Sequence, residues 1–288
     1  MMTARPRPRD HNRATPFRGI ARSRMIALMR HALLALALTA LPLQAQQIEV
    51  DVELALMVDV SRSMTPNEVE IQRRGYAEAI LSNEVMTAVQ SGLLGAIAVT
   101  YVEWAGNYTQ REIVPWTVIQ TPEDARAFTE ALSQTFAGGM RRTSISGAIE
   151  YGMDSIEGNA YTGLRRVIDV SGDGPNNQGS LVERARDAAV GKGIVINGLP
   201  LMTNEGLSGT WDIGGLDLYY RDCVIGGPGS FVIPVLEWSE FAAAVRRKLV
   251  LEIAGLPPPA QIIRAQAPFD CLIGEKMWEQ RRRYWDEP

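Results

Sequence analysis

The sequence predicts an α/β fold, with a doubly wound, mostly parallel six-stranded sheet, helices on both faces and one antiparallel edge strand. Three observations predict this fold. Apolar runs of strand length alternate with segments of helical period along most of the chain. The apolar runs are nearly continuous, as is typical of strands that are covered on both faces. The starts of several helices carry N-cap and proline signals.

Six segments have the length and composition of strands. The third contains Pro115, which is tolerated on an edge strand because proline donates no backbone hydrogen bond. The expected strands are residues 50–58, 96–104, 112–116, 167–171, 194–199 and 230–235.

The helices between these strands are marked by their first residues. Thr65 and Glu68 form a capping-box pattern that opens a helix to about residue 81, and Thr121 precedes a second helix. A strongly amphipathic helix follows Thr143. We expect a further capping box at Ser180 to Glu183, a helix after residue 238, and a short charged helix over residues 275–285.

The first 45 residues resemble a leader rather than part of the domain. Residues 1–30 hold eight arginines and one acidic residue, and the apolar run 32–43 follows. This pattern predicts a secretory signal peptide cut after Ala45, with an uncleaved amphipathic anchor as the alternative. We therefore expect an exported protein, periplasmic or extracellular, with a domain over 46–255, a tail over 256–288 and no membrane span after cleavage.

Removal of the leader changes the composition that remains. Eight of the 29 basic residues and one of the 33 acidic residues leave, so 21 basic and 32 acidic residues give a net charge of −11. Nucleic acid and anionic membranes are poor partners for such a chain. Both histidines, His11 and His31, are also lost. This excludes a Ser-His-Asp triad and a histidine zinc site, so any metal must be held by oxygen ligands.

Two cysteines, Cys223 and Cys271, are present in the chain. An even pair in an exported protein is expected to form a disulfide. Such a bond ties the glycine-rich segment 200–229 to the C-terminal tail. That segment is long for a connection between strands, and it either shapes partner choice or is a pinned surface excursion.

One set of polar residues interrupts the apolar pattern at strand ends. Asp59, Ser61 and Ser63 close the first strand, Thr143 precedes the amphipathic helix, and Asp173 follows the fourth strand. Ligands of doubly wound sheets bind beyond the carboxyl ends of the strands. Three hydroxyls and two carboxylates from three loops there predict a site for a hard divalent cation, with water completing an octahedral shell.

This set resembles the metal-ion-dependent adhesion site (MIDAS) of von Willebrand factor A (VWA) domains, and the resemblance covers about residues 50–255. The stretches 102–104 and 167–177 are similar to an uncharacterised family of exported bacterial proteins with this domain. The resemblance implies that Ser61, Ser63 and Thr143 contact Mg²⁺ or Mn²⁺, in preference to Ca²⁺, and that Asp59 and Asp173 bind it directly or through water. It also implies a protein partner that supplies an Asp or Glu carboxylate at the open position.

Five further residues are candidates for the rim of this site or for groups behind it. Arg62 stands where many such domains have glycine, and it either repels the metal or holds the partner's carboxylate. Glu103 is a group near the metal or an ordinary strand-end carboxylate. Asp169 lies in a buried strand and needs a local partner, for which an arginine is the candidate. Ser144 and Asn176 are neighbours of Thr143 and Asp173 along the chain.

Three classes of function are compatible with these residues. The first is a cation-dependent adhesion or scaffold protein that captures a partner carboxylate. The second is a metal-assisted hydrolase. Against it, the motif is Asp-x-Ser, and the chain after the leader has no histidine to act as acid or base. The third is a structural domain whose site is vestigial. We expect the first class, and no enzyme activity.

Overall fold

The chain divides into two units, residues 1–46 and 47–288, and only the second is described here. The computed structural model describes residues 47–133, 140–203, 213–256 and 268–286, and side chains only as far as Arg283. The expected signal peptide therefore lies outside the described residues.

A mixed five-stranded sheet forms the centre of the described unit, in the order β3-β2-β1-β4-β5. Strands β2, β1, β4 and β5 are parallel, and β3 pairs with β2 in the antiparallel direction. The mostly parallel sheet with one antiparallel edge strand is thus confirmed. The strands are β1 (Ile48–Asp59), β2 (Ile97–Trp104), β3 (Gln110–Ile119), β4 (Tyr161–Gly172) and β5 (Ile194–Pro200).

The expected sixth strand, residues 230–235, does not form. The segment runs beside β5 and makes only the isolated parallel bridges Gly198↔Val232 and Leu201↔Val235. Two features interrupt a regular ladder: Pro234 has no amide hydrogen, and the side chain of Asn197 accepts the Phe231 amide at 3.0 Å. The count of six strands was therefore wrong by this one segment.

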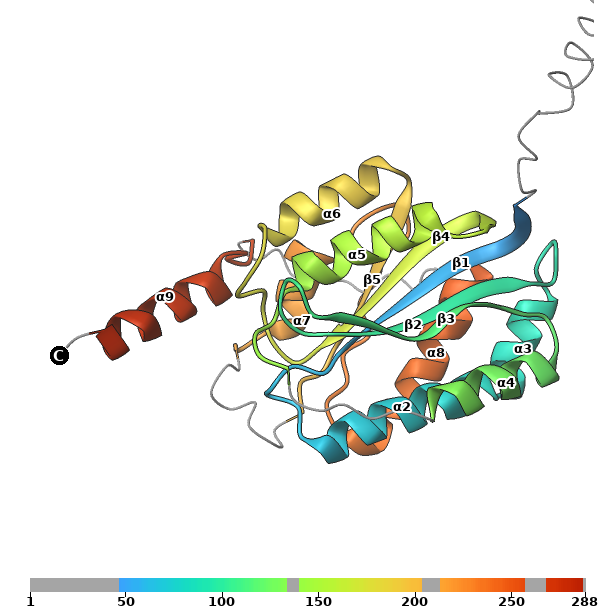
Figure 1. Ribbon diagram of the computed structural model, residues 1–288, viewed down its shortest axis with the longest axis horizontal. Helices are drawn as coiled ribbons and strands as arrows, with labels where there is room; N and C mark the ends of the chain where they lie inside the picture. Colours follow the sequence, from blue (N-terminus) through green and yellow to red (C-terminus); the bar gives the residue numbers. More distant parts are fainter. Residues whose placement is uncertain (1–46, 134–139, 204–212, 257–267, 287–288) are drawn as a thin grey trace, which may run out of the picture. The chain divides into compact units, whose positions relative to one another are not determined.

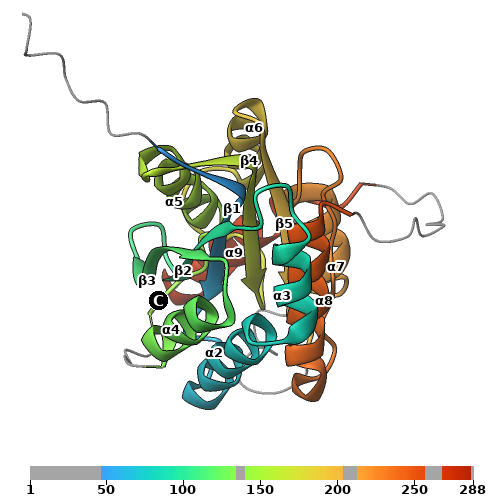
Figure 2. The same cartoon turned by 90° about the vertical axis from the view of Figure 1, so that its right-hand side faces the viewer.

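Helices cover both faces of the sheet (Figure 1), as expected. Helices α5 and α6 lie on one face, and α2, α3, α4 and α8 lie on the other (Figures 1 and 2). The helices are α2 (Pro66–Ile80), α3 (Asn83–Gln90), α4 (Pro122–Leu132), α5 (Ile145–Gly158), α6 (Val182–Gly191), α7 (Leu216–Tyr219), the π-helix η2 (Tyr220–Val224), the 3₁₀-helix η3 (Trp238–Glu240), α8 (Phe241–Ala254) and α9 (Ile273–Asp286).

The central strand β1 shows why its sequence is almost continuously apolar. Leu54, Leu56 and Val58 belong to the core that contains residues of α2, α4 and α8. The alternate residues Ala55 and Met57 belong to a second core, which contains residues of α5 and α6. Both faces of β1 are therefore buried, because successive side chains of a strand point to opposite sides.

Two of the expected helix starts have the predicted caps. The Thr65 hydroxyl accepts from the Glu68 amide and the Glu68 carboxylate accepts from the Thr65 amide, and Thr121 caps α4 in the same way. The capping box expected at Ser180 is wrong. The Ser180 hydroxyl donates to Glu150 at 2.6 Å, and α6 begins after Leu181 with no side-chain cap.

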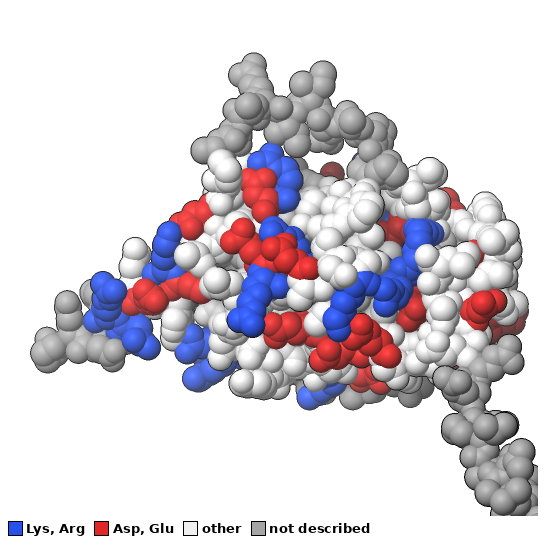
Figure 3. Space-filling view, turned by 90° about the horizontal axis from the view of Figure 1, so that it is seen from above, with Lys and Arg blue, Asp and Glu red and all other residues white. Residues whose placement is uncertain are grey.

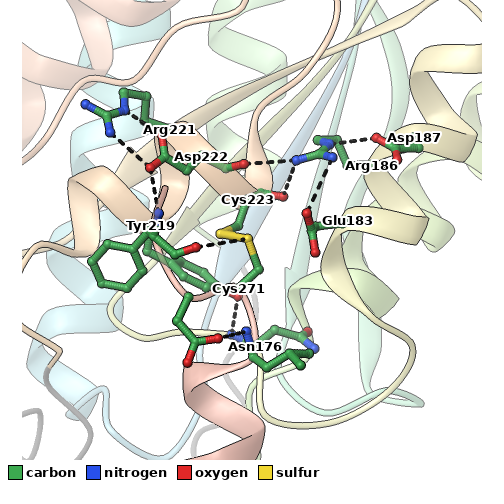
Figure 4. Close-up of a disulfide and its surroundings, with 12 residues drawn as sticks. Asn176, Glu183, Arg186, Asp187, Tyr219, Arg221, Asp222, Cys223 and Cys271 are labelled. Atoms are coloured by element: carbon green, nitrogen blue, oxygen red, sulfur yellow. Dashed lines mark hydrogen bonds and ion pairs between the residues drawn. A yellow bond between two sulfur atoms is a disulfide. The ribbon is translucent and has the colours of Figure 1, made fainter. Parts of the chain in front are cut away.

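The expected disulfide is confirmed. Cys223 in η2 is bonded to Cys271, 48 residues later and two residues before α9 begins, and the bond joins the 200–229 segment to the tail (Figure 4). Within that segment, residues 213–229 contain α7 and η2, and residues 204–212 lie outside the described chain. The disulfide therefore fixes the start of α9 to the second core, to which Cys223 belongs.

Candidate functional site

The candidate site lies at the carboxyl ends of the two central strands. Asp59 is the last residue of β1, and Asp173 follows the last residue of β4. These strands pair in parallel with Val58 opposite Ser171, so both aspartates emerge at the same edge of the sheet. This is where ligands bind in folds of this type.

Four of the five expected ligand residues form one hydrogen-bonded cluster. The Ser61 amide donates to Asp59 Oδ1 at 2.7 Å, and the hydroxyls of Ser61 and Ser63 lie 3.0 Å apart. The Ser63 hydroxyl donates to Asp173 Oδ1 at 2.8 Å. The loop after β1 is thereby joined to the loop after β4, two segments that are far apart in the sequence.

Backbone and side-chain hydrogen bonds attach the loop that carries Thr143 to both of the other loops. A parallel bridge joins Met140 to Ser61, the Thr143 amide donates to Asn177 Oδ1 at 3.1 Å, and the Asn177 amide donates to the Thr143 carbonyl at 2.9 Å. Thr143 itself is buried. The three loops of the predicted site are therefore held together.

Asp59 is the electrostatically unusual residue of this cluster. Its side chain is fully buried, and its Oδ2 atom has no hydrogen-bond partner. Burial, and secondly the charge of Asp173, raise the pKa of Asp59 well above its usual value, against the lowering effect of hydrogen bonds from Ser61. A buried carboxylate oxygen without a partner lowers the stability of the fold unless another group neutralises its charge.

The donor set fits a hard divalent cation. Carboxylate and hydroxyl oxygens are the ligands that Mg²⁺ and Mn²⁺ prefer, and the orphaned Asp59 Oδ2 offers an unused lone pair in the cluster. No group of three or more His, Cys, Asp or Glu side chains that could hold a metal occurs among the described residues. The MIDAS pattern does not require one, because hydroxyls supply three of its five ligands.

The other candidate residues at this edge of the sheet have well-defined positions. Arg62 is exposed. Glu103 lies on β2, opposite Val58 of β1. It is buried and forms an ion pair with Arg73 of α2 at 2.6 Å. Ser144 caps α5 by accepting the Gly147 amide at 3.1 Å.

Asn176 connects three segments. Its Oδ1 accepts from the Ser146 amide at 3.0 Å, and its Nδ2 donates to the Ser180 carbonyl at 3.2 Å and to Glu275 of α9 at 2.7 Å. Its own amide donates to the Tyr219 hydroxyl at 3.1 Å. Asn176 therefore joins the Asp173 loop to α5 and to the C-terminal helix.

Asp169 belongs to a separate buried network. Its partner is Lys248 of α8 at 2.6 Å, so the expected arginine is wrong. Lys248 also pairs with Glu252 at 2.5 Å, and Glu252 accepts from Asn197 at 2.9 Å. Burial raises the pKa of Glu252 to about 7, against the lowering effect of Lys248. This network fastens α8 to β4 and β5.

Sequence reasoning missed the contacts of the C-terminal helix with the site loops. Arg142 lies over the ring of Trp278, with its guanidinium carbon 3.2 Å from the ring centre, and Glu275 bonds Asn176. No local pattern indicates such contacts, because they depend on how a distant helix docks.

The comparisons with known proteins identify the family. The sequence profile of the family described as "Protein of unknown function (DUF1194)" matches residues 49–257. The chain belongs to this family. A search of curated proteins finds no match.

Solved structures show that this member of the family has a VWA-like fold. Proximal thread matrix protein 1 from the mussel byssus has a TM-score of 0.52 and 14% identity, over 73% of this chain and 49% of that one. The pilus adhesin SpaC from Lactobacillus rhamnosus GG gives 0.51 and 13%, over 74% and 32%. A von Willebrand factor type A protein from Catenulispora acidiphila gives 0.50 and 14%, over 71% and 43%. The chain thus spans about half or less of each of these structures.

No helix in the described part of the chain is long and apolar enough to cross a membrane.

Proposed function

We propose that this chain is an exported protein-binding module that captures a carboxylate of its partner through a divalent cation. The cation is held by Asp59, Ser61, Ser63, Thr143 and Asp173. The observation that carries this proposal is the hydrogen-bonded cluster of Asp59, Ser61, Ser63 and Asp173, in which Oδ2 of Asp59 is buried and unpartnered. The loop that carries Thr143 is attached to this cluster by the bridge between Met140 and Ser61.

The five residues supply two kinds of ligand to the cation. Asp59 and Asp173 supply negative charge, and the hydroxyls of Ser61, Ser63 and Thr143 supply neutral oxygen ligands. Mg²⁺ or Mn²⁺ suits this set better than Ca²⁺. When bound, the cation supplies a Lewis-acid centre that attracts an Asp or Glu carboxylate of the partner. Arg62 is exposed and lies between Ser61 and Ser63 in the chain, and it can add a charge-assisted hydrogen bond to that carboxylate.

Solved structures with the same fold support binding over turnover. One solved structure with this fold is a pilus adhesin and another is a matrix protein. A hydrolase needs a proton donor or acceptor at the cation, and the chain after Ala45 has no histidine. A vestigial site is the remaining alternative, and against it the five ligand residues are all present.

The leader and the surface support an envelope or extracellular protein partner. The leader directs export, and the chain that follows has a net charge of −11. On the face that Figure 3 shows, basic and acidic side chains are interspersed, with no broad basic patch for nucleic acid.

Partner capture from envelope extract tests the proposal. Immobilised protein should retain a partner in Mg²⁺ and release it in EDTA. Asp59→Ala and Thr143→Ala should abolish retention, because each removes one ligand. Thr162→Ala is the matched control, since Thr162 is exposed on β4, whose opposite end carries the site.

Capture that persists in EDTA and in Asp59→Ala would contradict the proposed mechanism. Metal-dependent hydrolysis of phosphoester or peptide substrates, lost in both site variants and kept in Thr162→Ala, would instead favour the enzyme.

A further inference from the structure

The start of α9 packs against the loop that carries Asp173. This loop comprises residues 173–177. The Glu275 carboxylate accepts from Asn176 Nδ2 at 2.7 Å. One residue earlier, Gly274 is buried, and a Cβ atom added there would overlap the carbonyl oxygen of Asn176. Only glycine allows the helix to approach this loop so closely.

The same helix also contacts the loop that carries Thr143, residues 140–144. The Arg142 guanidinium lies on the face of the Trp278 ring, 3.2 Å from its centre. Among the described residues, Arg142 is the only one other than glycine with a positive φ, at 79°. Side chains rarely adopt this conformation unless their surroundings hold them in it. Thr143 is the next residue, so the Trp278 contact bears directly on its position.

The start of α9 is itself fixed to the body of the domain. The Cys223–Cys271 disulfide attaches the residues just before it, and the Phe269 amide donates to Asp222 at 3.0 Å. Ile273 and Met277, one helical turn apart, pack against the second core. A helix anchored in this way can hold the two loops in place.

We propose that residues 271–278 are a clamp that holds the Thr143 and Asp173 loops in the arrangement that binds a cation. This inference rests on the proposed metal site. Gly274, Glu275 and Trp278 are positioning residues in it, because they act on the loops through Asn176 and Arg142. Loss of groups that orient metal ligands from outside the coordination shell costs about 10- to 100-fold in metal affinity.

Two variants with the disulfide intact test the clamp in the mature protein. Gly274→Ala should push α9 away from Asn176, and Trp278→Ala should remove the support of Arg142. Glu279→Ala, at an exposed position on the same helix, is the control. Hydrogen exchange of the Thr143, Ser146 and Asn177 amides is measured in EDTA, and the Mg²⁺ dissociation constant is measured by titration calorimetry.

Both clamp variants should exchange faster at these three amides while the β1 amides stay protected, and their Mg²⁺ dissociation constants should rise by about 10- to 100-fold. Unchanged exchange in both variants would overturn the clamp. Faster exchange that includes β1 would also overturn it, because it would report general destabilisation. A wild-type protein that binds no Mg²⁺ would overturn the proposed function alone, since exchange is measured without metal.

Discussion

Replacement of Asp59 by asparagine should show that the buried carboxylate destabilises the metal-free domain and that the cation needs it for binding. Asp59 is fully buried beside Asp173, and its Oδ2 has no partner. Asparagine removes the charge and keeps an oxygen that can accept the Ser61 amide. A buried charge costs more than a buried neutral polar group, and Asp173 repels it, so removal of the charge in Asp59→Asn should stabilise the metal-free domain by about 1–3 kcal/mol. For a domain of this size this is a rise of roughly 2–12 °C in Tm.

Addition of metal should stabilise the wild type alone. At a hundredfold excess of Mg²⁺ over its dissociation constant, the wild type should gain about 2.7 kcal/mol, and Asp59→Asn should gain nothing. Thermal unfolding in EDTA and in Mg²⁺, followed by circular dichroism, measures both effects. Asp154→Asn, at an exposed position on α5, should change neither. A lower Tm of Asp59→Asn than of the wild type in EDTA would contradict the cost assigned to the buried charge, and a Tm shift with Mg²⁺ retained in Asp59→Asn would contradict its role as a ligand.

Further predictions concern the rest of the chain. Lys248→Met leaves two buried carboxylates without their cation and should cost about 3–5 kcal/mol in urea unfolding at pH 8. An acid with a raised folded-state pKa contributes stability at low pH that is lost as the pH rises. The pKa of Glu252 near 7 therefore predicts that wild-type stability falls between about pH 5 and 8, and that the Lys248→Met penalty is smaller at pH 5. A double Cys223→Ser, Cys271→Ser variant should lose about 4 kcal/mol, because the bond closes a loop of 48 residues. N-terminal sequencing of the exported protein should start at Gln46, and an intact leader on the folded protein would contradict the signal peptide.

Those parts of the fold that depend on local patterns could be predicted from the sequence. The continuous apolar run of β1 reflects two buried faces, and the Thr65 capping box forms as expected. Four of the five predicted ligand residues also meet, because β1 and β4 are parallel neighbours whose carboxyl ends lie at one edge of the sheet.

The parts that depend on tertiary contacts could not be predicted. The segment 230–235 has strand composition, but Pro234 and the Asn197 side chain interrupt its pairing. Ser180 has the sequence of a cap, yet Glu150 of a neighbouring helix takes its hydroxyl. Both outcomes are decided by residues outside the local window.

The sequence also does not predict which residues pair with the buried charges, or where α9 docks. Lys248 lies far along the chain from Asp169, and nothing in the strand pattern distinguishes lysine from arginine as its partner. The contact between Arg142 and Trp278 joins two segments without any shared periodicity.

Calorimetric titration of Mg²⁺ into the metal-free mature protein is the most direct test of the cation site. One cation per chain should bind to the wild type and to Thr162→Ala, and none should bind to Thr143→Ala, with the fold of each variant verified by circular dichroism. The absence of binding in the wild type, or equal binding in Thr143→Ala, would contradict a cation site built from these three loops.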